Sequence, residues 1–126
     1  MSLFDIWTGV DFNDRESSYQ KAIDLLKKDN ILASGPFVDE SNGKLYWRSS
    51  IVGTFQYLAA FIQGCIRAKR IIDSHSSADY QVILGNTFNV TFDPKPFKSI
   101  GTRSIDFHYL DPFKPLDRLL TNPRIT

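Results

Sequence analysis

The sequence predicts a single compact domain over residues 1–126, mainly helical (α+β), with a short β-hairpin and a winged-helix-like C-terminal part. Three observations predict this fold class. Apolar residues recur every three or four positions in several segments, as on the buried faces of helices. A cluster of turn-forming residues separates two short β-prone runs, which indicates a hairpin. Hydrophobic residues make up 42% of the chain and include ten Phe, five Tyr and two Trp, which is enough for one core without disulfides.

The first helix is predicted to begin at Asn13 and to end near Asn30. Asn13 and Glu16 have the spacing of a capping box, in which each side chain binds the other residue's backbone N–H. The apolar positions that follow at helical spacing are Tyr19, Ala22, Ile23 and Leu26. The segment 34–36, Ser-Gly-Pro, then ends this part of the chain.

The hairpin is predicted around residues 39–43, Asp-Glu-Ser-Asn-Gly, which is a sequence typical of a turn. Residues 37–38 and 45–47 are the expected short strands on either side of it.

The second helix is predicted to begin after Ser49 or Ser50, either of which is a suitable cap. Its apolar stripe consists of Ile51, Phe55, Leu58, Ile62, Cys65 and Ile66. Arg67, Lys69 and Arg70 follow at the end, where the helix dipole favours positive charge. This regular helix is expected to be the central packing element, with Cys65 as a buried, unreactive thiol.

A third helix is predicted from about Ala78 to Phe88, and Asn89 is expected to adopt the left-handed conformation in the turn that follows. A short second helix then begins behind Asp93-Pro94, and residues 102–109 alternate between polar and apolar, which predicts a strand. The last helix begins at Asp111-Pro112 and closes at Asn122-Pro123; its inward residues are Phe113, Leu116, Leu119 and Leu120. Helix, turn, helix and strand in this order are typical of a winged helix, a DNA-binding motif.

The leading functional hypothesis is therefore a small non-enzymatic DNA-binding or regulatory protein. Lys95, Lys98 and Arg103 are expected to contact phosphates of duplex DNA, and Arg67, Lys69 and Arg70 to form a flanking patch. Residues 1–63 carry a net charge of −2 and residues 64–126 one of +3, which agrees with an anion-facing C-terminal half. Ordinary solvated faces also produce such a difference, so solvated lysines in a surface loop remain the alternative.

Two stretches resemble RteC-type regulators of Bacteroidetes mobile elements. They are Leu-Tyr-Trp-Arg-Ser-Ser at 45–50 with the apolar helix after it, and Asn-Thr-Phe-Asn-Val at 86–90. The resemblance covers roughly residues 44–100 and implies a helical regulator of excision or transfer, with a winged-helix-like DNA-binding part. The segment Asp-Pro-Lys-Pro at 93–96 and the chain after Gly101 depart from the family pattern.

The alternative function is a protein-interaction module, such as an immunity-type inhibitor or an assembly factor, without DNA binding. Aromatic residues are dense in the Pro-rich C-terminal region, and an exposed patch of them marks a protein partner. The candidates are Phe97, Phe107, Tyr109 and Phe113. These residues can also simply cover the core.

No catalytic group, metal site or cofactor is predicted. His75, His108 and Cys65 form no short pair of metal ligands, and no Gly-rich phosphate loop is present. The apolar-rich stretch 51–66 is too short and too polar to span a bilayer. With one cysteine and no secretory signal, the protein is expected in the cytoplasm, without a membrane partner.

Overall fold

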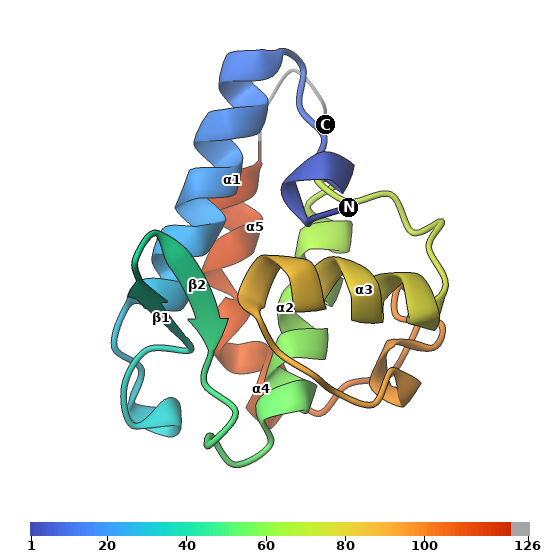
Figure 1. Ribbon diagram of the computed structural model, residues 1–126. Coiled ribbons are helices and arrows are strands. Elements are labelled where there is room, and N and C mark those ends of the chain that lie inside the picture. The colour runs from blue at the N-terminus through green and yellow to red at the C-terminus, as the bar shows by residue number, and fades with distance from the viewer. Residues whose placement is uncertain (122–126) are drawn as a thin grey trace.

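The computed structural model, shown in Figure 1, describes residues 1–121. Its helices and strands are α1 (Phe12–Lys27), β1 (Val38–Ser41), β2 (Lys44–Trp47), α2 (Thr54–Arg67), α3 (Ser77–Phe88), α4 (Phe107–Leu110) and α5 (Pro115–Leu120). Single 3₁₀ turns, named η1 to η4, occupy Phe4–Ile6, Ile31–Ala33, Lys95–Phe97 and Asp111–Phe113. The predicted class, mainly helical with one small antiparallel hairpin, is confirmed.

Helix α2 is the central packing element, as predicted. Most of its residues are buried, and Leu58, Ile62 and Cys65 have no exposed surface. Burial raises the pKa of the Cys65 thiol well above its usual value, so this side chain is an unreactive thiol. Helices α1 and α5 run side by side along the core (Figure 1).

Two predicted helix starts are wrong by a few residues. Asp11, not Asn13, caps α1, because its carboxylate accepts a hydrogen bond from the Asp14 N–H at 2.8 Å. Helix α2 begins at Thr54, behind Gly53, rather than after Ser49 or Ser50. Gly53 has φ +72°, a left-handed conformation that Gly adopts without strain, so the loop turns there and not at the serines.

The hairpin is confirmed, but its strands are longer than predicted and include residues 39–41, which were expected in the turn. Asn42 and Gly43 have φ values of +52° and +75°, the conformation of the two-residue turns that suit hairpins. Val38 pairs with Trp47 at the open end of the ladder. The Trp47 indole stacks on Phe37 with ring centroids 5.6 Å apart and donates to the Thr54 hydroxyl, so the hairpin is fixed to the start of α2.

The third helix ends as predicted. Ser76 and Asp79 form a capping box at its start, and Asn89 has φ +50° at its end. Beyond this point the winged-helix prediction is wrong in two details. The second helix is only the 3₁₀ turn η3, because the backbone leaves the helical conformation directly after it, with ψ 124° at Lys98 and φ +55° at Ser99.

The second detail is the strand predicted for residues 102–109. Residues 102–105 form no regular element, and α4 occupies Phe107–Leu110. Asp106 explains the difference, because its carboxylate accepts from the His108 N–H at 2.9 Å and so caps a helix. The last helix is present as η4 and α5, with Phe113, Leu116 and Leu120 buried; its predicted end at Asn122-Pro123 lies outside the described residues.

Arg70 connects four segments from inside the structure. Arg70 is 1% exposed, and its side chain forms two hydrogen bonds with the Asp14 carboxylate, at 2.7 and 3.2 Å. It also donates to the backbone carbonyls of Leu120 and Thr8. The prediction that Arg70 belongs to a DNA-binding patch is therefore wrong, because its guanidinium group is used within the fold.

No helix among the described residues is long and apolar enough to cross a bilayer.

The raised pKa values of two tyrosines predict that the protein loses stability at alkaline pH. Burial raises the pKa of both Tyr19 and Tyr80 from 10.0 to about 12, because the core disfavours the charged phenolate. The unfolded chain releases these protons first, so the stabilising contribution is complete below about pH 10 and is lost as pH rises through about 12. We expect the free energy of unfolding, measured in urea, to fall across this window together with the appearance of tyrosinate absorbance. A constant free energy across the window would contradict this assignment.

Candidate functional site

Three of the predicted DNA contacts lie on one exposed loop. The Arg103 guanidinium donates to the backbone carbonyl of Lys95 at 3.2 Å, so these residues are neighbours. Lys98 is exposed on the same loop. The Lys95 ammonium lies 4.0 Å from the Asp93 carboxylate. This loop is therefore cationic, but it also includes an acidic side chain.

The loop lies along α2, and two of the remaining predicted cations follow it at the end of that helix. Pro96 lies beside Gln56, near the start of α2, and the Arg103 backbone carbonyl accepts a hydrogen bond from the Gln63 amide at 2.6 Å. Arg67, one turn after Gln63, and Lys69 are both exposed. With Arg70 buried, the predicted flanking patch is reduced to two side chains.

The four predicted aromatic contacts have very different environments. Phe97 and Phe113 are buried, so their assignment to an exposed patch is wrong. The Phe97 ring packs 5.1 Å from Phe92, and the Phe113 ring packs 5.7 Å from Phe61. Phe107, in contrast, is 78% exposed.

Tyr109, the fourth aromatic residue, is half-buried and fixes α4 to α2. Its ring meets Tyr57 edge-on at 5.0 Å and lies over Gly53, where an added Cβ would come within 2.6 Å of it. The neighbouring His108 shares a hydrogen bond of 3.0 Å with the Tyr57 hydroxyl. Helix α4 is short, but these contacts give Phe107 a defined position on the surface.

Three surface hollows surround α4, and we call this region the α4 surface. Two of them, of about 400 and 220 Å³, share Phe107 and Lys114 in their lining. The third, of about 160 Å³, includes Arg103, Asp106 and Tyr109 in its lining. The exposed Phe107 therefore borders two of the three hollows.

The charges on the α4 surface are balanced. Its cations are Arg67, Arg103 and Lys114, and its carboxylates are Asp106, Asp111 and Asp117. Lys114 and Asp111 form an ion pair at 2.9 Å. An apolar centre with a rim of mixed charge is typical of a protein interface, whereas a nucleic-acid site concentrates cations.

The sequence prediction missed Asp106, Asp111 and Lys114. Two signals pointed to them: Asp106 precedes an apolar run, as an N-cap does, and Asp111 and Lys114 have helical i,i+3 spacing. Among the described residues, no three His, Cys, Asp or Glu side chains gather closely enough to hold a metal ion.

Comparison of the chain with protein-family models, with curated proteins and with solved structures finds no match. The resemblance to RteC-type regulators stays a prediction from the sequence.

Proposed function

We propose that this protein is a non-enzymatic interaction module that binds a partner protein through the α4 surface. The observation that carries this proposal is the 78% exposure of Phe107 on a helix whose other residues are held in place. We place this activity in the cytoplasm, an assignment supported by the free, buried thiol of Cys65.

The anatomy of the α4 surface supports a protein partner. Interfaces are commonly anchored by a few aromatic or arginine side chains in a well-packed centre that is surrounded by a polar rim. Phe107 would supply the anchor, and the two hollows beside it would accept side chains of the partner. Arg67 and Lys114 would lie on the rim.

Affinity capture tests the proposal with a matched pair of variants. Phe107→Ala removes the anchor, whereas Phe12→Ala removes another exposed phenylalanine, 62% exposed, at the start of α1. We expect the wild type and Phe12→Ala to retain the same proteins from extracts of cells that make the protein, and Phe107→Ala to lose them. Equal retention by all three proteins would contradict the proposal.

A binding experiment with duplex DNA tests the leading hypothesis from the sequence, which is that the protein binds DNA. The segment expected to enter the major groove is the single turn η3, and its Phe97 faces the core. We expect no saturable binding of duplex DNA at micromolar protein in low salt, measured by fluorescence anisotropy. Saturable binding that weakens steeply with salt and is lost in Lys95→Glu/Lys98→Glu would restore the DNA hypothesis.

A further inference from the structure

The α4 surface carries an exposed aromatic ring and recesses on the same patch. Phe107 is exposed and lines both the hollow of about 400 Å³ and the hollow of about 220 Å³. A symmetric contact between two copies of one chain uses the same patch on both sides, so a group that protrudes from the patch must meet a recess of that same patch. The α4 surface has both parts, whereas a contact with a different protein requires only one of them.

The smaller hollow has the size and the lining that a phenyl ring needs. Ala60 and Gly64 lie one turn apart on α2 and, together with Leu110 and Phe113, supply its apolar lining. Because Ala60 and Gly64 have almost no side chain, they leave space beside the helix. An apolar cavity of about 150 Å³ accommodates benzene. A hollow of about 220 Å³ therefore has room for the Phe107 ring of another copy.

The charges of the α4 surface allow it to face its own copy. Among the residues that the structure describes, three cations and three carboxylates line its hollows, so the surface has no net charge. A patch with an excess of one sign would repel its own copy, because like charges across an interface are costly. The whole chain has a net charge of +1, so the remaining repulsion between two copies is weak.

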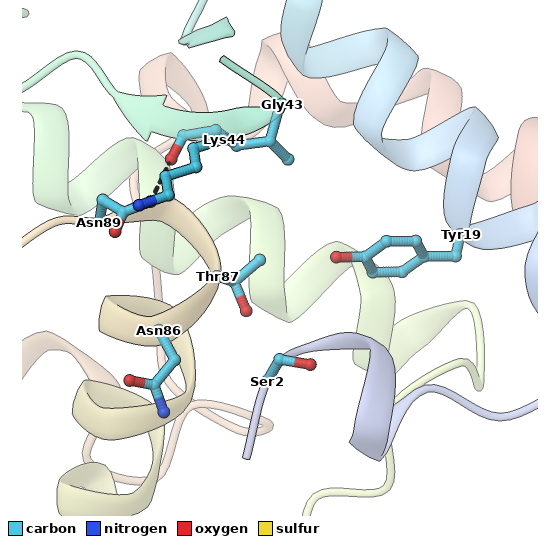
Figure 2. Close-up of a pocket in the computed structure, with 8 residues that line it drawn as sticks. Ser2, Tyr19, Gly43, Lys44, Asn86, Thr87 and Asn89 are labelled. Carbon is cyan, nitrogen blue, oxygen red and sulfur yellow. Dashed lines mark hydrogen bonds between the residues drawn. The ribbon is translucent and has the colours of Figure 1, made fainter. Parts of the chain in front are cut away.

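The recess shown in Figure 2 offers no comparable contact. It has a volume of about 340 Å³ and lies between the N-terminal segment, α1, the hairpin turn and α3. The Thr87 hydroxyl already accepts a hydrogen bond from the Leu3 N–H, and the Asn89 amide donates to the Leu45 carbonyl (dashed line). None of the described residues that line this recess is a large, exposed apolar side chain. The recess therefore lacks an apolar anchor.

From the ring, the hollow and the balanced charges we propose that the α4 surface binds a second copy of this chain and forms a symmetric dimer. The Phe107 ring of each copy occupies the apolar hollow beside Phe107 of the other copy. Around the two rings, cations of one copy pair with carboxylates of the other. This inference rests on the proposed function and names the partner protein.

Sedimentation equilibrium of the purified full chain tests for the dimer. Between micromolar and millimolar concentrations, we expect the measured mass to rise reversibly from that of one chain to that of two. Phe107→Ala is expected to raise the dimer dissociation constant at least about 30-fold. Phe12→Ala, which removes another exposed phenylalanine, is expected to dimerise as the wild type does. A chain that stays monomeric, or a dimer equally stable in Phe107→Ala, would overturn the proposal.

An exchange of charges tests whether the surface faces itself. Asp111→Lys/Asp117→Lys and Arg67→Glu/Lys114→Glu each reverse two exposed charges, so each surface acquires four excess charges of one sign. We expect each variant to be monomeric on its own and an equimolar mixture of the two to form dimers. Circular dichroism checks that both variants fold. A mixture that does not associate, or a variant that dimerises as tightly as the wild type, would contradict the symmetric contact.

Affinity capture separates this inference from the proposed function. We expect the tagged wild type to retain untagged copies of this chain, and tagged Phe107→Ala to lose them. If the chain alone is monomeric but capture retains other proteins in a Phe107-dependent way, the α4 surface binds a protein and the second copy is the wrong partner. If the chain is monomeric and nothing is retained, the inference and the proposed function both fail.

Discussion

Arg70→Met is expected to lower the free energy of unfolding by about 3–5 kcal/mol, the usual cost of removing one partner from a buried ion pair. Arg70 is 1% exposed, and the Asp14 side chain that it binds is 12% exposed. Met fills much of the same volume without the charge. The carboxylate of Asp14 and the carbonyls of Leu120 and Thr8 then each lose a hydrogen-bond donor.

The effect is large because Arg70 joins segments that are distant in the sequence. Asp14 is in the first turn of α1, Leu120 is the last residue of α5, and Thr8 lies between η1 and α1. A Lys at position 70 keeps the charge but lacks the planar group that binds a carboxylate with two hydrogen bonds, so Arg70→Lys is also expected to be destabilising.

Urea denaturation followed by circular dichroism measures this loss. Arg67→Met is the matched control: it removes an exposed arginine from the last turn of α2 and should change the free energy of unfolding by no more than about 0.5 kcal/mol. If Arg70→Met also changes the free energy of unfolding by no more than this amount, the guanidinium group is solvated and does not form a buried ion pair with Asp14.

Phe107→Ala is expected to weaken binding of the partner protein by at least about 2 kcal/mol, which is roughly a 30-fold rise in Kd. The physical reason is that a large aromatic ring in the centre of an interface buries apolar area and fills recesses that Ala leaves empty. Because the ring is 78% exposed in the isolated chain, its removal should leave the free energy of unfolding within about 0.5 kcal/mol of the wild-type value.

Isothermal titration calorimetry with the purified partner measures the change in Kd, and urea denaturation checks the fold. Phe12→Ala controls for the general loss of an exposed aromatic ring and should leave Kd unchanged. If the Kd of Phe107→Ala lies within threefold of the wild-type value, Phe107 does not anchor the interface.

Features that depend on neighbouring residues were predictable from the sequence. The turn at Asn42-Gly43 and the left-handed Asn89 follow from the conformations that Gly and Asn adopt at low cost. The central helix α2 follows from its apolar periodicity.

Features that depend on tertiary packing were not predictable from the sequence. Phe97, Phe107 and Phe113 are the same residue type in one short region, yet only Phe107 is exposed. Their exposure is set by which rings face α2 and α3, and periodicity gives no such information in a region without long helices. Arg70 follows a basic run and suggests a surface patch, but its partner Asp14 is 56 residues away.

The strand predicted at residues 102–109 shows how a local cap overrides a pattern. Ile105, Phe107 and Tyr109 alternate with polar residues, as they would in a strand. The Asp106 carboxylate binds the His108 N–H, however, and Tyr109 packs on Tyr57, which favours a helical turn. This turn is what exposes Phe107.

Photo-crosslinking from position 107 tests whether the α4 surface binds a protein. p-Benzoylphenylalanine is placed at position 107 or, as a control, at position 12, and cells that make the protein are irradiated. We expect discrete protein adducts from position 107 that are absent from position 12. The same adducts from both positions, or none from position 107, would contradict this expectation.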